Sequence, residues 1–101
     1  MAVEARLVEL GLTLPAPPRP VGACVPHVST GPYVYVTGEE ATVNDEFVYT
    51  GKVGRDLTLR DGYDTARIVE LNCLASLKAA VGYLDRVERG VKVVGYVNSV
   101  L

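Results

Sequence analysis

The sequence predicts an α/β (α+β) domain in which a small mixed sheet packs against one long helix, with a short helix at the N-terminus. Three observations carry this prediction. The run GPYVYVTGEE at 31–40 has the β-branched and aromatic residues of a strand, set between turn residues. A helical apolar period extends over 58–81, and strand-like alternation returns in GVKVVGYVNS at 90–99. Their order predicts a hairpin, a crossover helix and a returning strand.

The N-terminal part begins with a short amphipathic pattern. Residues 2–11 place Val3, Leu7 and Leu10 three to four positions apart, which predicts a helix that Gly11 ends. The next run, LTLPAPPRP, contains four prolines, whose rings fix φ and remove backbone donors, so it is extended. A Pro-rich ligand for a small adaptor domain and a rigid spacer both fit this composition, and we favour the spacer.

The chain divides into an N-terminal helix with its Pro-rich linker, 1–20, and a folded part, 21–101. At 101 residues the two together have the length of one compact domain. Within the folded part we expect three strands, separated by turn residues around Gly31 and Asn44. They are Val25–Ser29, Tyr33–Thr37 and Phe47–Tyr49.

The long helix has a clear start and stop. Thr58 and Asp61 have the spacing of a capping box, with Asp in place of the usual Glu or Gln, and Gly82 ends the helix after Val81. An apolar stripe is expected to face the sheet, with Asp64, Arg67 and Lys78 opposite. The stripe comprises Ala66, Val69, Cys73, Leu77 and Ala80, widened by Leu74 and Val81.

The last predicted strand starts at Val91. It is apolar on both faces, with Val91, Val93 and Val97 on one side and Val94 and Tyr96 on the other. Such a strand is usually central and covered twice. The predicted sheet then carries one helix layer, and its other face is rich in valine and tyrosine. We expect the N-terminal helix or another subunit to cover that face.

Charge argues against a nucleic-acid binder. The net charge is −2, from 10 basic and 12 acidic residues. Phosphate neutralisation normally requires a basic patch. The densest basic run, Arg86, Arg89 and Lys92, is interleaved with Asp85 and Glu88, as in a solvated face.

Metal binding and membrane insertion also lack sequence support. The chain has 2 cysteines, Cys24 and Cys73, in no metal-binding spacing, and His27 is its 1 histidine. We expect neither a metal nor another cofactor. No run approaches the ~18 apolar residues of a membrane span. The N-terminus contains Glu4 and Glu9 rather than the apolar core of a secretory signal, so we expect a cytoplasmic protein.

Four segments together indicate a family. They are RLVELGLTLPAPPRPVGACV, TGPYVYVTGEE, YTGKVGRDLTLRDGYDTARIVELNCLASLKAAVG and LDRVERGVKVVGYVNS, and they cover nearly the whole chain. The chain resembles the RidA/YjgF family, also called endoribonuclease L-PSP, and in particular the branch that begins with a helix and a Pro-rich linker. The resemblance implies a chorismate-mutase-like fold and a homotrimer with sites in clefts between subunits. It also implies hydrolysis of reactive 2-enamine or 2-imine acids to keto acids and ammonia.

The resemblance nominates substrate-binding residues after the second strand. Thr37 and Gly38 match the family's Ser-Gly, which lines the cleft, although Gly38 is equally well a strand-ending bulge. Glu39 stands where the family has glutamine, either as an acid or base or as an exposed carboxylate. Cys24 replaces the tyrosine of the family's GPY motif, either as a reactive thiol or as a small buried apolar residue.

Further along the chain, Asn98 and Ser99 end the last strand near the expected cleft and are candidate ligand contacts. Asn72 matches a family asparagine on the long helix, and we interpret it as structural, satisfying backbone groups. Gly90 replaces the bulky aliphatic residue of close relatives, which weakens packing at the start of this strand.

The end of the chain departs from the family pattern. By the resemblance, the carboxylate-binding arginine and the water-positioning glutamate lie in a segment after Leu101, so the chain is expected to be truncated relative to the family. Arg55 is the best substitute for that arginine, although it sits on no matching motif. The other arginines weighed for this role are Arg60, Arg67, Arg86 and Arg89.

Three functions therefore remain open. The first is hydrolysis of a small 2-imino acid or a related small carboxylate in a trimer cleft. The second is a non-catalytic oligomeric module that binds a small metabolite or a protein, which the missing arginine favours. The third is RNA cleavage, as in the family's older name, which the acidic net charge and the single His27 disfavour.

Overall fold

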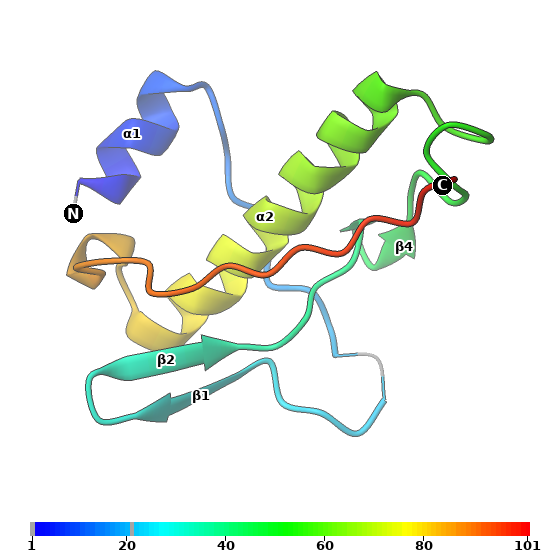
Figure 1. Ribbon diagram of the computed structural model, residues 1–101. Helices are drawn as coiled ribbons and strands as arrows, with labels where there is room; N and C mark the ends of the chain where they lie inside the picture. Colours follow the sequence, from blue (N-terminus) through cyan, green and yellow to red (C-terminus); the bar gives the residue numbers. More distant parts are fainter. Residues whose placement is uncertain (1, 21) are drawn as a thin grey trace.

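The structure is a computed structural model that describes residues 2–20 and 22–101. A hairpin packs against one long helix, and a short N-terminal helix lies near that helix's C-terminal end (Figure 1). The expected α/β (α+β) class with a long helix is confirmed. In chain order the elements are α1 (Val3–Glu9), β1 (His27–Thr30), β2 (Tyr33–Val36), β3 (Thr42–Val43), β4 (Glu46–Phe47), α2 (Leu59–Val81) and the 3₁₀ helix η1 (Leu84–Arg86).

The first hairpin follows directly from its sequence. β1 and β2 pair antiparallel, with Val28 opposite Tyr35 and Thr30 opposite Tyr33. Gly31, at the first position of the two-residue turn, has φ of 55°, a conformation that glycine adopts without a steric penalty. The first two predicted strands are confirmed, with β1 starting two residues later than expected.

A second, short hairpin forms where the sequence predicted only a turn and one following strand. β3 and β4 pair antiparallel around Asn44 and Asp45, whose φ values of 53° and 64° are those of a tight hairpin turn. The predicted third strand ends at Phe47 rather than Tyr49. Tyr49 itself has φ of 54°, which turns the chain out of strand geometry.

Both ends of α2 agree with the prediction. Thr58 Oγ1 accepts a hydrogen bond from the Asp61 N–H at 3.1 Å, and Asp61 Oδ2 accepts from the Thr58 N–H at 2.9 Å, which completes the capping box. Gly82, with φ of 86°, ends the helix. The buried face differs from the prediction: Ala66 is exposed. The residues that are buried are Asn72, Ala75 and Ser76.

The small core lies where α1 meets η1 and the end of α2. Leu7 and Leu84 are buried there. Glu4 fixes the contact, because its carboxylate accepts from Lys78 Nζ at 3.2 Å and from the Leu84 N–H at 3.0 Å. The Glu4 N–H donates to Asp85 Oδ1 at 2.9 Å. α1 therefore covers one end of the helix layer, and the hairpin face that carries Val28, Tyr33 and Tyr35 stays exposed.

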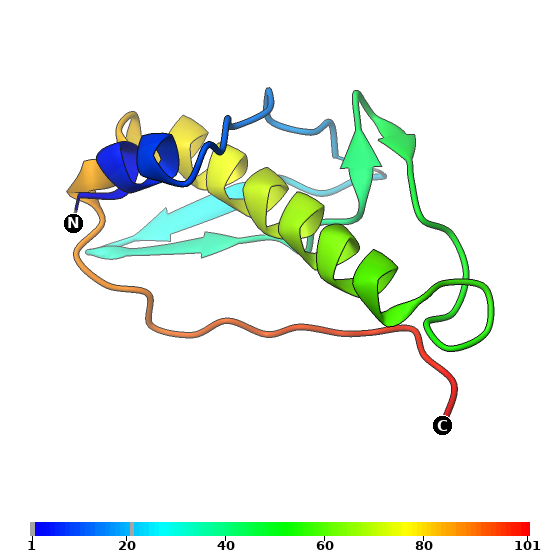
Figure 2. The same ribbon diagram turned by 90° about the horizontal axis from the view of Figure 1, so that it is seen from above.

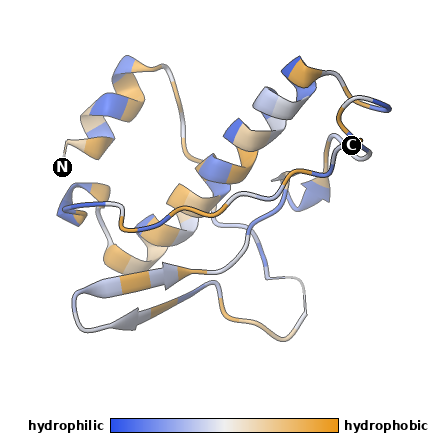
Figure 3. Ribbon diagram, viewed as in Figure 1, coloured by the Kyte–Doolittle hydropathy of each residue, from blue (hydrophilic) through white to orange (hydrophobic). Residues whose placement is uncertain are grey.

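The prediction of a central strand from Val91 is wrong for this chain. Residues 88–97 run as an outlying extended segment past α2 (Figure 2), and none of them forms a backbone hydrogen bond with another described residue. Pairing begins only where Val53 bridges to Ser99. Apolar residues recur along the segment (Figure 3), but Val93 is 80% and Tyr96 94% exposed. The segment has the amino-acid composition of a strand, but the described part of the chain provides no neighbouring strand that pairs with residues 88–97.

Candidate functional site

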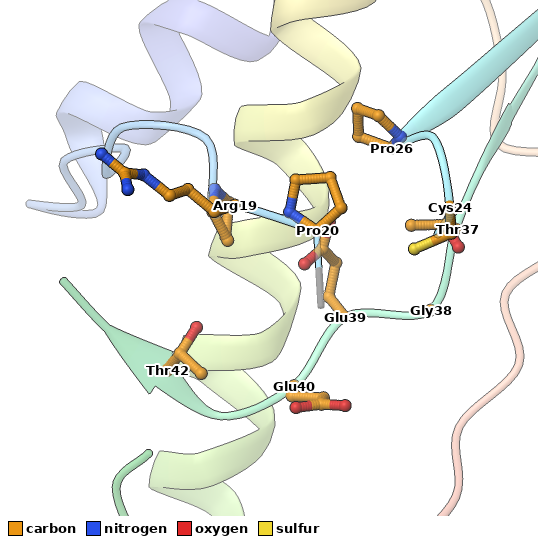
Figure 4. A pocket seen from close by; sticks show the side chains of 10 residues that line it. Arg19, Pro20, Cys24, Pro26, Thr37, Gly38, Glu39, Glu40 and Thr42 are labelled. Atoms are coloured by element: carbon orange, nitrogen blue, oxygen red, sulfur yellow. The ribbon is translucent and has the colours of Figure 1, made fainter. Parts of the chain in front are cut away.

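A small cavity lies between the Pro-rich linker and the segment that follows β2 (Figure 4). Four of the predicted site residues line it: Cys24, Thr37, Gly38 and Glu39. Its volume is about 70 Å³. Pockets for drug-sized ligands are typically several hundred Å³, so this cavity suits water or a molecule of a few heavy atoms.

The cavity exists because the linker is stiff and is tied down at one point. Pro18, Pro20 and Pro26 contribute rings to its wall. Between the first two, the Arg19 N–H donates to Asp45 Oδ1 at 3.0 Å, which holds the linker against the turn between β3 and β4. On the other side the Thr37 N–H donates to the Pro26 carbonyl at 3.0 Å. One wall of the cavity is therefore held by a bond from the backbone to the Asp45 side chain, and the other by a backbone–backbone bond.

Two buried side chains of α2 hold residues 37–42, the segment after β2 that lines the cavity and is named the cavity segment. Asn72 Nδ2 donates to the carbonyl oxygens of Glu40 and Thr42, both at 3.0 Å. The Ser76 hydroxyl donates to Glu39 Oε1 at 2.8 Å. The structural role predicted for Asn72 is confirmed. Glu39 is half-buried rather than fully exposed, and its carboxylate is held by the Ser76 hydroxyl.

The other three predicted site residues lie elsewhere, around the loop at 51–57. Asn98 Nδ2 donates to the Gly51 carbonyl at 3.1 Å, and the Val53 N–H donates to the Asn98 carbonyl at 3.0 Å. Ser99 forms the bridge with Val53. Arg55 is close in sequence to this bridge. The structure thus separates the candidates into a cavity group and a loop group.

Arg55 is already occupied by a neighbour. Its Nη2 and Nε atoms donate to Asp56 Oδ2 at 2.9 and 3.1 Å. The Arg55 guanidinium, helped by the Lys52 N–H, holds the pKa of the Asp56 carboxyl below its ordinary value. A cation engaged in this way is a weak substitute for a substrate-binding arginine, and its role stays a prediction.

The two cysteines differ in environment. Cys24 is exposed, so its interpretation as a small buried residue is wrong, and the reactive-thiol interpretation stays a prediction. Cys73 is half-buried on α2, where burial, and then the charges of Glu70 and Glu39, raise the pKa of its thiol to about 11. The influence of Glu39 on Cys73 places that carboxylate against α2, in agreement with its bond to Ser76.

Sequence reasoning missed Arg19 and Ser76. Arg19 lines the cavity on the linker, with a side chain 90% exposed and a long contact of 3.8 Å to Asp45. Its guanidinium points away from Thr37 and Cys24 (Figure 4). A lone arginine between two prolines was the available signal. Ser76 carried no signal, because its partner lies 37 residues away in sequence.

The described residues, 2–20 and 22–101, contain neither a cluster of potential metal ligands nor a helix that could span a membrane. No group of three or more potential metal ligands occurs among these residues. No helix in the same ranges is both long and apolar enough to span a bilayer.

Comparison with known proteins agrees with the resemblance drawn from the sequence. The family model described as YjgF/chorismate-mutase-like, putative endoribonuclease matches residues 4–100. Protein TCP17 of Trypanosoma cruzi is 37% identical over 97 residues, which are 96% of this chain and 61% of that protein.

Solved structures that are similar to this one include two at 35% sequence identity. A putative endoribonuclease from Shewanella oneidensis superposes with a TM-score of 0.77 at 35% identity, over 82% of this chain and 55% of that one. A protein of unknown function from Agrobacterium tumefaciens gives a TM-score of 0.67 at 35% identity, over 79% of this chain and 48% of that one. The chain thus spans roughly half to three fifths of the length of these relatives. It belongs to the YjgF/chorismate-mutase-like family of putative endoribonucleases.

Proposed function

We propose that this protein hydrolyses small, reactive 2-enamine or 2-imine acids to keto acids and ammonia, in a site built on the cavity beneath the Pro-rich linker. The observation that carries the proposal is the gathering of Cys24, Thr37, Gly38 and Glu39 around one small cavity, with Glu39 held by a buried hydroxyl. A carboxylate beside a water-sized space is the arrangement that activation of a water molecule requires.

The reaction needs one proton acceptor and one nucleophilic water. Glu39 takes a proton from water as the water oxygen adds to the imine carbon, and the C=N electron pair moves to nitrogen. Glu39 returns this proton to the nitrogen, which gives the neutral carbinolamine. It then takes the proton of the carbinolamine hydroxyl and passes it to the nitrogen as the C–N bond breaks, which releases ammonia and leaves the C=O group of the keto acid. The sum is imino acid plus water to keto acid plus ammonia. The Thr37 hydroxyl, on a residue that lines the cavity, is the dipole that we assign to the developing charge.

The charges around the cavity suit a ligand with two poles. Glu39 and Glu40 line it together with Arg19. A protonated imino acid carries a positive nitrogen and a negative carboxylate. The two acids match the nitrogen end, and the planar guanidinium of Arg19, after turning inward, matches the carboxylate. Arg19 thereby takes the role for which Arg55 was first considered.

Assembly is part of the proposal. The chain exposes 7631 Å². A folded monomer of 10.8 kDa exposes about 5,500 Å². The difference, about 2,000 Å², exceeds the ~800 Å² that each partner of a standard interface buries. We propose a homotrimer whose subunits cover the exposed hairpin face and complete the walls of the site.

The test is keto acid release from an imine generated in situ by a serine or threonine dehydratase. Protein should accelerate release above the spontaneous rate. Glu39→Gln should lower kcat by about 100-fold, and Arg19→Ala should raise KM more than it lowers kcat. Arg55→Ala is the matched control and should leave both values unchanged. No acceleration from folded, oligomeric protein would sink the proposal.

Two alternatives have their own support. A non-catalytic binding module is favoured by the engagement of Arg55 with Asp56. It predicts binding of small carboxylates without turnover. RNA cleavage is favoured by the description of the matching family model. It predicts degradation of single-stranded RNA at low salt, and a flat RNA titration would dismiss it.

A further inference from the structure

Ser76 makes an unusual contact for a serine inside a helix. Such hydroxyls commonly donate to the carbonyl four residues earlier. Thr65 in the same helix does so, donating to the Asp61 carbonyl at 2.7 Å. Ser76 instead donates to Glu39 Oε1 at 2.8 Å, and the residue is completely buried. The hydroxyl is thus directed out of the helix toward the cavity segment and is shielded from water.

The backbone around Glu39 is held from the same face of α2. Asn72, one turn before Ser76, donates to the carbonyls of Glu40 and Thr42. Asn72 and Ser76 are 2% and 0% exposed, so both act in a sheltered environment where a hydrogen bond is strong. In the cavity segment, Asn72 therefore fixes the backbone and Ser76 fixes the Glu39 side chain, both from the same face of α2.

No ion pair among the described residues holds the Glu39 carboxylate, so its orientation depends on the Ser76 hydroxyl. On α2, Cys73 lies close enough to Glu39 for the charge of Glu39 to raise the pKa of its thiol. Glu40 is next to Glu39 in the chain, and Arg19 lines the cavity from the linker. None of the ion pairs within residues 2–20 and 22–101 includes Glu39. Its Oε2 atom accepts no hydrogen bond within the same residues.

We propose that Ser76 is a positioning residue for Glu39: by binding Oε1, it presents Oε2 to the ligand in one orientation. This inference rests on the proposed function, in which Glu39 is the acid–base group. Ser76 touches no ligand and acts only through Glu39. A carboxylate without this donor would rotate about its side-chain torsions and would meet the reacting water in fewer of its conformations.

The experiment compares Ser76→Ala, Ser76→Thr and Glu39→Gln in the imine hydrolysis assay. Ser76→Ala should lower kcat about tenfold with little change in KM. Ser76→Thr, which keeps the hydroxyl, should recover most of the rate. In a Glu39→Gln background, Ser76→Ala should cause no further loss of rate.

A second measurement does not depend on turnover. In protein labelled with ¹³C at the glutamate carboxyl carbons, Glu39→Gln identifies the Glu39 signal by its disappearance. Ser76→Ala should move that signal and leave the Glu4 signal in place. If wild-type protein shows no hydrolysis but the Glu39 signal moves, the proposed function fails while the contact stands. If the signal does not move, or if Ser76→Ala costs the same rate in the Glu39→Gln background as in the wild-type background, the positioning role is overturned.

Discussion

The two ends of α2 differ sharply in how they are covered. The buried residues lie in its C-terminal half or in α1 and η1 near that end, and they are Leu7, Asn72, Ala75, Ser76 and Leu84. At the N-terminal end Leu59 is 69% and Tyr63 65% exposed. The same helix therefore has a packed end beneath α1, η1 and the cavity segment, and a bare end beside the loop at 51–57.

The difference shows that amphipathic pattern does not decide burial by itself. Leu59 and Tyr63 are apolar and belong to a well-capped helix, yet no described element packs over them. Asn72 and Ser76 are polar and buried, because the cavity segment brings acceptors for their donors. Burial follows the elements that arrive from elsewhere in the chain.

The largest expected effect tests this contrast with one substitution at each end. Leu84→Ala removes a side chain with 0% exposure and should lower the free energy of unfolding by about 2–5 kcal/mol. Leu59→Ala is the matched control and should change it by less than about 0.5 kcal/mol, because Leu59 is largely in solvent. Urea denaturation followed by circular dichroism measures both. Equal losses would show that the bare end is covered in solution.

A second pair compares asparagines. Asn72→Ala leaves the carbonyls of Glu40 and Thr42 without their donor and should destabilise the protein by about 1–3 kcal/mol. Asn98→Ala removes an exposed bond to the Gly51 carbonyl and should cost well under about 1 kcal/mol. The denaturant midpoints of the two variants give the comparison. A larger loss for Asn98 would reverse the assignment of the stable end.

The smallest effect concerns reactivity and leaves stability unchanged. With a pKa of about 11, the Cys73 thiol is ionised in about one molecule in a thousand at pH 8, and its alkylation should quicken about tenfold per pH unit up to pH ~10. Because the neighbouring carboxylates help to raise this pKa, Glu70→Gln and Glu39→Gln should each lower it and speed alkylation at pH 8.

Iodoacetamide labelling followed by mass spectrometry measures that rate, in a Cys24→Ser background that removes the exposed thiol. Labelling of Cys73 that is fast at pH 7 and independent of both carboxylates would contradict the environment described for the packed end.

Local sequence signals predicted the elements that need few distant partners. Thr58 with Asp61 and Gly82 define the ends of α2, because a cap satisfies the helix's own backbone groups. Gly31 defines the first turn, because glycine adopts the positive φ of this turn without help from distant residues. The segment after Val91 was wrongly predicted, because a strand exists only when neighbouring strands accept its hydrogen bonds.

The candidate site was predictable in part. The resemblance placed Cys24, Thr37, Gly38 and Glu39 together, and the structure brings them to one cavity. Asn98 and Ser99 were grouped with them because they were assigned to a strand that does not form. Whether any of these residues binds substrate stays a prediction.

Local chemistry in the chain was sufficient for the capped helix, the tight hairpin and the family, since each depends on residues close together or on a pattern spread along the sequence. Packing alone selected the buried face of α2, placed Arg19 on the cavity and paired Ser76 with Glu39. These features depend on contacts between residues tens of positions apart, and the free energy of such contacts appears only when the chain has folded.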